Sequence, residues 1–317
     1  MDFQRYGLVD SPFTARPDAG FVPLPSRAEP ANRLAGALRD ALGLAVLSGS
    51  PGLGKSAICR ELTRQLSGEF LVVLLHDAGL STRRSLLQGV LHGLELPYVG
   101  LSEHESRLRL LDSIRDRRHQ RSALVLLVDE AQRLNDRLLL ELRGLITYEA
   151  EGVPLIRLLL SGDQHLEDRL LEPELAAIQQ RIACHEVLEP LTQSESAQLL
   201  DARLVQAGGD GWEHVFSRAA MELICLVSDG SPRQLEQLAH RSLVAGTVAR
   251  ETRVSADSVR RALDDLRTLP LHWNEPSNMQ TYLQRDLHLS EWAGATPTAD
   301  DPTDPFSSSS EQDSAMD

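Results

Sequence analysis

The residues with the clearest chemical potential lie in one short stretch, residues 49–56, which reads GSPGLGKS. The stretch matches the phosphate-loop pattern G-x-x-x-x-G-K-[ST], with an apolar run before it and a helix-like segment after it. Glycines let backbone N–H groups surround a phosphate, Lys55 would reach the β- and γ-phosphates, and the Ser56 hydroxyl would ligate Mg²⁺. An ordinary glycine turn is the competing interpretation, but it does not require these flanks. The stretch predicts an ATP site formed by Gly49, Ser50, Pro51, Gly52, Leu53, Gly54, Lys55, Ser56 and Ala57.

A pair of carboxylates follows the apolar run at residues 123–128. Asp129 would hold Mg²⁺ through water, and Glu130 would orient and deprotonate the water that attacks the γ-phosphate. Acidic pairs also cap helices that follow strands, which is the alternative interpretation. The position of the pair, about 70 residues after the phosphate loop with one predicted strand between them, favours the catalytic role.

Four further polar residues could serve the same site. Ser161 and Asp163 follow the apolar run at residues 155–160 and would emerge beside the γ-phosphate, where a polar side chain can sense the nucleotide. Capping of the next helix explains both residues equally well. Arg181 and Arg233 lie near the ends of predicted elements. In a chain with 31 arginines, spacing alone assigns neither of them a role.

The elements that position these residues can be predicted from the alternation of short apolar runs with longer helical patterns. The predicted strands are residues 44–48, 70–76, 123–129, 155–161 and 184–188. The helices predicted between them are residues 56–66, 85–94, 103–118, 136–148 and 174–180. From Thr192 onward the pattern predicts only helices, at residues 192–207, 218–227, 232–248 and 256–269. The fold class is therefore α/β, a P-loop NTPase with a parallel five-stranded sheet and a C-terminal helical lid domain.

The same pattern divides the chain into five parts. They are an N-terminal lead-in segment (1–30), a P-loop α/β domain (31–190), a helical lid domain (191–270), a short helical extension (271–292) and a disordered acidic tail (293–317). The tail is expected to be disordered because it is rich in Ser, Asp, Pro and Thr and has few apolar residues to bury.

Composition excludes several classes of protein. The formal net charge of −14 argues against a surface that grips nucleic acid throughout, although a local patch is allowed. The one basic cluster, residues 115–121, is better explained as a solvated helix face. Apolar runs are too short to span a bilayer, and the N-terminus does not resemble a signal peptide. Three widely separated cysteines suit a reduced compartment, so we expect a cytoplasmic protein without a membrane segment.

Taken in order, these motifs resemble those of AAA+ ATPases, and in detail the ATPase module of general secretion pathway protein A and related transposition-helper ATPases. The resemblance begins in YGLVDSPFTARPDAGF and continues through GSPGLGKS, VDEAQRL, SGDQHLEDRL, QQRI and LEPLTQSES to DGSPRQLEQL. It covers roughly residues 5–250.

The resemblance implies roles that spacing alone does not give. Arg233 in DGSPR occupies the place of a lid arginine that contacts the γ-phosphate of its own chain. Arg181 in QQRI resembles the finger that one subunit offers to its neighbour's nucleotide, which implies ATP-dependent homo-oligomers. Asp163 stands where the family is expected to have a sensor glutamine. The membrane segment and cell-wall-binding domain usual in those secretion proteins are not seen here, so a secretion role does not follow from the fold.

Three functions compete at this point. The first is an ATPase that couples nucleotide state to assembly and to action on a protein or DNA partner. The second is a nucleotide-gated binding switch with little hydrolysis. The third is a small-molecule kinase, which would need neither Glu130 beside Asp129 nor a lid arginine. The set of residues from Lys55 to Arg233 favours the first.

Overall fold

The computed structural model describes residues 3–13, 20–40, 43–76, 80–117 and 123–267. The helical extension expected at 271–292 and the acidic tail expected at 293–317 lie outside these ranges. The chain forms two compact units. The sheet unit is Pro23–Glu189, and the helical unit combines Met1–Val22 with Pro190–Asp317.

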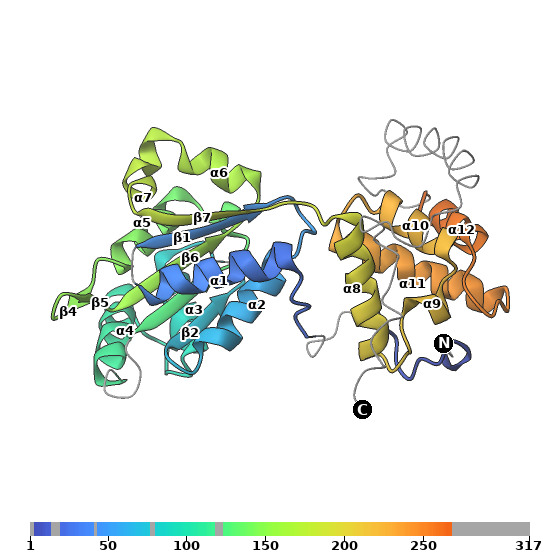
Figure 1. Cartoon of the computed structure of the whole chain (residues 1–317). Helices are drawn as coiled ribbons and strands as arrows, with labels where there is room; N and C mark the ends of the chain where they lie inside the picture. The colour runs from blue at the N-terminus through green and yellow to red at the C-terminus, as the bar shows by residue number, and fades with distance from the viewer. Residues whose placement is uncertain (1–2, 14–19, 41–42, 77–79, 118–122, 268–317) are drawn as a thin grey trace, which may run out of the picture. The chain divides into compact units, whose positions relative to one another are not determined.

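Five parallel strands form the centre of the sheet unit, in the order β2-β3-β6-β1-β7 (Figure 1). They are β1 (Leu44–Gly49), β2 (Leu71–Leu75), β3 (Leu124–Val128), β6 (Ile156–Ser161) and β7 (Ile182–Leu188). The inner strands β3 and β6 are buried along their whole length, which explains their nearly continuous apolar sequence. The α/β class and the five-stranded parallel sheet predicted from sequence are confirmed. A small antiparallel pair, β4 (Glu149–Ala150) and β5 (Val153–Pro154), lies outside the predicted strands.

Helices cover both faces of this sheet. Contacts place α1 and α2 on one face and α3, α4 and α5 on the other. The helices of the unit are α1 (Pro25–Arg39), α2 (Lys55–Leu66), α3 (Arg83–Gly93), α4 (Glu103–Arg117), α5 (Asp136–Leu145), α6 (Gln164–Leu170) and α7 (Ala176–Gln179), with short 3-10 turns at Ala131–Arg133 and Pro173–Leu175. Among the residues that the structure describes, no helix is long and apolar enough to cross a membrane.

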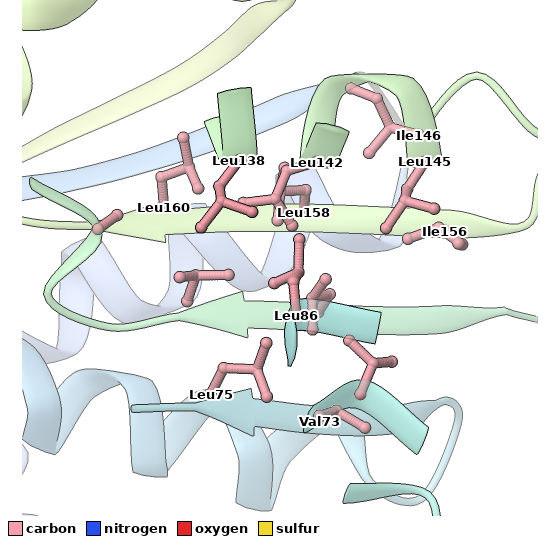
Figure 2. Packing of buried hydrophobic residues seen from close by; sticks show 14 of the residues in the cluster. Val73, Leu75, Leu86, Leu138, Leu142, Leu145, Ile146, Ile156, Leu158 and Leu160 are labelled. Carbon is pink, nitrogen blue, oxygen red and sulfur yellow. The ribbon is translucent and has the colours of Figure 1, made fainter. Parts of the chain in front are cut away.

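The main core lies between α3, α4 and α5 and one face of the sheet. Figure 2 shows Leu138, Leu142 and Leu145 of α5 lying over β6, beside Leu158 and Ile156. Their spacing of four and three residues puts the three leucines on one side of a helix, and alternate residues of the strand face them. This packing holds β3 and β6 in register, so the residues at their carboxyl ends meet at one edge of the sheet.

The helical unit consists of α8 (Gln193–Gln206), α9 (Trp212–Val215), α10 (Arg218–Val227), α11 (Pro232–Val248) and α12 (Ala256–Arg267), with a 3-10 turn at Gln4–Tyr6. The N-terminal segment packs into it. Phe3 and Leu8 are buried, the Phe3 ring meets His240 edge-on, and the backbone N–H of Val9 donates to the Ala207 carbonyl at 2.9 Å. The chain therefore passes between the units twice, once after residue 22 and once after residue 189.

Candidate functional site

The phosphate loop connects the end of β1 to the start of α2, as its motif requires. Gly49, Gly52 and Gly54 have φ values of 147°, 89° and 98°, a region that glycine enters without steric cost. Gly49 also lies against the end of β7, where an added Cβ would stand 2.9 Å from the Leu188 carbonyl oxygen. No side chain caps α2, so the positive end of its dipole faces the loop.

Lys55 lies inside the loop and is only 6% exposed. Its ammonium donates to the Gly49 carbonyl at 2.7 Å and to the Ser50 carbonyl at 3.2 Å. These bonds hold the charge at the mouth of the loop, beside the backbone N–H groups that would surround a phosphate.

Asp129 connects the loop to the neighbouring strands. Its Oδ2 accepts from the Ser56 hydroxyl at 2.6 Å, and its Oδ1 accepts from the Ser161 hydroxyl at 2.9 Å and from the Glu130 backbone N–H at 3.1 Å. The His76 Nδ1 lies 3.7 Å from Oδ2. Asp129 is 1% exposed and Ser161 is fully buried, so the carboxylate has one fixed orientation.

The Ser56–Asp129 pair suits Mg²⁺. A hydroxyl and a carboxylate oxygen lie side by side, and Mg²⁺ binds through one or two such protein oxygens while water and substrate phosphates complete its shell. Within the described ranges, no group of three or more His, Cys, Asp or Glu side chains could hold a metal by itself. The pair of oxygens on Ser56 and Asp129 fits a Mg²⁺ ion whose remaining ligands are water and phosphate.

Glu130 follows Asp129 in a left-handed backbone conformation, with φ of 55°, which is uncommon for a residue other than glycine. Its side chain is 40% exposed. The Gln132 amide donates to Glu130 Oε2 at 3.0 Å, and Arg133 Nε lies 3.8 Å from the same oxygen. The turn thus leaves the Glu130 carboxylate partly exposed, and Gln132, which the sequence did not single out, donates a hydrogen bond to it.

Ser161 and Asp163 have different surroundings. Ser161 ends β6 and bonds to Asp129. Asp163 is the N-cap of α6, and its carboxylate accepts from the His165 N–H at 3.0 Å. The structure therefore brings Ser161 into contact with the site residues, whereas the side-chain hydrogen bond of Asp163 caps a helix.

Arg181 lies in the sheet unit but away from this cluster, and Arg233 belongs to the helical unit. Arg181 precedes β7 and is exposed, and Ile182 pairs with Leu44 at the start of β1. The phosphate loop begins five residues later, about 16 Å along the strand. Arg233 is an exposed residue in the first turn of α11, in the helical unit.

A different arginine, Arg27, contacts the phosphate loop directly. Arg27 of α1 is 5% exposed, and its Nε donates to the Leu53 carbonyl at 3.1 Å. Its Nη2 donates to the Glu189 carbonyl at 2.9 Å. Arg27 lies 26 positions before Leu53 and outside the phosphate-loop motif, so the motif does not predict this contact. The contact is seen only in the structure, where the buried guanidinium meets the loop.

Cys59 lies behind the loop on α2 and is fully buried. Burial, together with the negative charge of Asp129, raises the pKa of its thiol to about 12. The thiol is therefore neutral and chemically inert at physiological pH, as a small apolar group would be.

Comparison with known proteins gives a family match for part of the chain. Residues 39–170 match the family model described as AAA domain. General secretion pathway protein A of Aeromonas hydrophila is 31% identical over 251 residues, which are 77% of this chain and 45% of that protein. The chain thus spans less than half of this relative.

Solved structures share the fold. The Cdc6p protein of Pyrobaculum aerophilum superimposes with a TM-score of 0.66 at 22% identity, covering 84% of this chain and 76% of that one. The ORC2 protein of Aeropyrum pernix, in ADPNP–ADP complexes, gives a TM-score of 0.64 at 18% identity, covering 82% and 72%. These identities are low enough that the likeness concerns the fold alone.

Proposed function

Because the chain carries an AAA domain and has the P-loop fold of AAA+ ATPases, we propose that it binds ATP with Mg²⁺ and hydrolyses it to ADP and phosphate. The observation that carries the proposal is the cluster of Lys55, Ser56 and Asp129 at the carboxyl ends of β1 and β3. The phosphate loop alone could be a turn. A buried carboxylate bonded to the loop's own serine is what a metal-assisted phosphate site needs.

Each residue has a distinct task in this proposal. The glycines and Lys55 bind the phosphates, and Ser56 and Asp129 hold Mg²⁺, which when bound neutralises phosphate charge. Glu130 orients the attacking water and accepts its proton, from the accessible position that its turn creates. Ser161 keeps the Asp129 carboxylate in its orientation.

Arg181 and Arg233 complete the site in the proposal, on the resemblance to AAA+ ATPases. Arg181 lies about 16 Å along the sheet from its own phosphate loop, so it would act on the nucleotide of a neighbouring copy. Arg233 would contact the γ-phosphate of its own chain. The active form would then be a homo-oligomer assembled around ATP, in the cytoplasm.

The same position of Arg181 supports a second candidate, a nucleotide-gated switch. An unassembled chain would bind ATP without the finger of a neighbour and would hydrolyse it slowly. The rate of phosphate release per subunit, measured over a hundredfold range of protein concentration, separates the two functions. A rate that rises with assembly supports the ATPase, and a negligible rate at every concentration supports the switch.

The variant Glu130→Gln tests the catalytic assignment. It removes the base but keeps the size of the side chain, so we expect ATP binding to persist while hydrolysis falls about a hundredfold or more. Fluorescent ATP binding and steady-state phosphate release measure the two effects. Equal rates in the wild type and the variant would rule out Glu130 as the base.

The same variant addresses the partner. A chain arrested with ATP bound should retain the protein on which it acts, and a pull-down identifies that protein. Secretion is named only for the relative, of which this chain spans 45%, so a partner in that process is one candidate among others. A DNA partner is tested by a titration with ATP at two salt concentrations, since phosphate contacts weaken with salt.

A further inference from the structure

Arg27 makes contacts that neither the phosphate-loop motif nor the proposed hydrolysis explains. It is a buried cation in the first turns of α1, and each of its nitrogens donates to a carbonyl group of the backbone. Nη1 donates to Ser26, Nε to Leu53 and Nη2 to Glu189. A buried guanidinium must be fully hydrogen-bonded to be tolerated, and the three segments it bonds are far apart in sequence.

The bond to Ser26 has a local cause. Pro30 lies inside α1 and has no N–H, so the Ser26 carbonyl cannot receive the helical bond that residue 30 would normally donate. Arg27 Nη1 donates to that carbonyl at 3.1 Å and to the Ser26 hydroxyl at 3.0 Å. The proline thus helps to fix the guanidinium in one orientation, with Nε and Nη2 directed at the two distant segments.

The first distant segment is the phosphate loop. Leu53 is one of its residues, and the Arg27 Nε lies 4.0 Å from the position that a Cβ on Gly54 would occupy. Any movement of the loop backbone around a phosphate must therefore lengthen or shorten the bond from Arg27 to the Leu53 carbonyl.

The second distant segment is the exit from the sheet unit. Glu189 is the last residue of that unit, and Pro190 begins the returning part of the helical unit. The next residue, Leu191, donates its N–H to the Gly230 carbonyl at 2.8 Å. Gly230 has φ of 68° and leaves no space for a Cβ against the Leu191 backbone, so these two segments are tightly joined. Gly230 in turn lies two residues before α11.

We propose that Arg27 is a positioning residue that couples nucleotide occupancy of the phosphate loop to the backbone at Leu191 and Gly230. The path runs from Leu53 through the guanidinium to Glu189, then along the chain through Pro190 to Leu191. Pro190 restricts the backbone between Glu189 and Leu191, so a displacement of Glu189 is transmitted to Leu191 rather than absorbed. The proposal rests on the proposed function, because it requires that the loop bind a nucleotide.

Hydrogen exchange of the Leu191 N–H tests the coupling directly, because that group makes the bond at the end of the path. In the wild type, Mg²⁺ with ATPγS should change the exchange rate of the 186–194 segment about threefold or more. In Arg27→Lys, the charge remains but the three-way fork is lost. We expect ATPγS affinity within about threefold of wild type and no change in exchange at Leu191. Arg27→Met should also lower affinity, about tenfold, since the charge is gone.

Arg157→Met is the matched control. Arg157 is another buried arginine of the sheet unit, 7% exposed, and it also donates to backbone carbonyls of α1, those of Leu38 and Arg39. It does not bond the phosphate loop or Glu189, so the exchange response should persist even if the unit is destabilised. If Arg27→Met fails to fold, Arg27→Lys alone decides.

Five results are informative. Loss of the response in both Arg27 variants, with the response kept in Arg157→Met, supports the coupling. A wild type that binds ATPγS without any response at Leu191, or an Arg27→Lys variant that responds fully, overturns the coupling and leaves the proposed function intact. Loss of the response in Arg157→Met as well would reduce Arg27 to general packing. A wild type that does not bind ATPγS overturns both proposals.

Discussion

At the residue scale, the position of the single lysine is the most informative fact about this chain. Arginine supplies all 31 other basic residues, and Lys55 alone lies in the phosphate loop. The structure gives a physical reason. A buried ammonium fits between the Gly49 and Ser50 carbonyls, at 2.7 and 3.2 Å, where a broad planar guanidinium would not.

The variant Lys55→Arg should therefore lose ATP turnover while keeping the fold. We expect a drop in hydrolysis of about a hundredfold or more, since a guanidinium that does not fit between these carbonyls cannot place its charge at the phosphates. Phosphate release measures the first effect, and circular dichroism with thermal unfolding measures the second. Near-normal hydrolysis in a folded variant would contradict the assignment of the loop.

Ser161→Ala tests the orientation of Asp129. The variant removes one buried donor from that carboxylate, so we expect a loss of about 1–3 kcal/mol in the free energy of unfolding. Hydrolysis should fall about tenfold if the carboxylate turns away from Ser56. Phosphate release and urea unfolding report the two effects.

The control for this variant is Ser242→Ala. Ser242 is equally buried, and its hydroxyl donates to the Leu238 carbonyl within α11. Its loss should leave hydrolysis unchanged. If Ser161→Ala hydrolyses ATP at the rate of Ser242→Ala, the Ser161 hydroxyl has no part in the site.

The site residues differ in how far sequence could predict them. The phosphate loop and the Asp129–Glu130 pair can be recognised in the sequence, because close phosphate contact requires their residue types at fixed spacing. Arg27 and Gln132 do not. An arginine and a glutamine are ordinary surface residues by composition, and only the burial of Arg27 and the hydrogen-bond partners of both residues single them out.

At the element scale, the sheet was predictable because a strand buried on both faces must be apolar throughout. Each of the five predicted strands agrees with the observed one within two residues at either end. Helix α1 was not predicted. Pro25 and Pro30 interrupt its pattern, yet the first occupies the opening turn and the second is tolerated because Arg27 satisfies the carbonyl it leaves.

The short helix α6 allows the two roles of Asp163 to be separated. An N-cap needs a side-chain acceptor but no charge, so Asp163→Asn should keep both stability and hydrolysis. Asp163→Ala should lower the free energy of unfolding by about 1 kcal/mol. Thermal unfolding measures the stability of both variants, and phosphate release measures their hydrolysis.

Asn135→Ala removes the equivalent cap of α5, where the side chain accepts from the Leu138 N–H at 3.1 Å. It calibrates the cost of a lost cap away from the sensor position. If Asp163→Asn is stable but hydrolyses ATP slowly, the carboxylate itself acts on the nucleotide, and capping is not its whole role.

At the scale of the whole molecule, the chain forms two compact units joined by two passages of the chain. Sequence patterns do not reveal that the N-terminal segment belongs with the C-terminal helices. The burial of Phe3 and Leu8 depends on contacts with residues about 200 positions away, and periodicity reports only local structure.

Each unit carries its own internal probe, a buried cysteine. Cys59 is in the sheet unit, and Cys225, in α10, is 3% exposed in the helical unit. Burial raises the pKa of both thiols to about 12. At pH 8 both remain protonated in the folded chain, and the thiolate is the reactive form. Alkylation must therefore wait until the surrounding unit opens, so its rate measures how often each unit opens.

Nucleotide should act on these two rates unequally. A ligand that binds only the closed sheet unit lowers the population of its open form by a factor of about [L]/Kd when [L] is well above Kd, so ATPγS with Mg²⁺ at about one hundred times its Kd should slow Cys59 alkylation about a hundredfold. The Cys225 rate should not change, because the helical unit can open without releasing the phosphate loop. Mass spectrometry of the alkylated peptides measures both rates in one sample, and Lys55→Arg should abolish the protection of Cys59. Equal protection of both cysteines would instead mean that the two units open together.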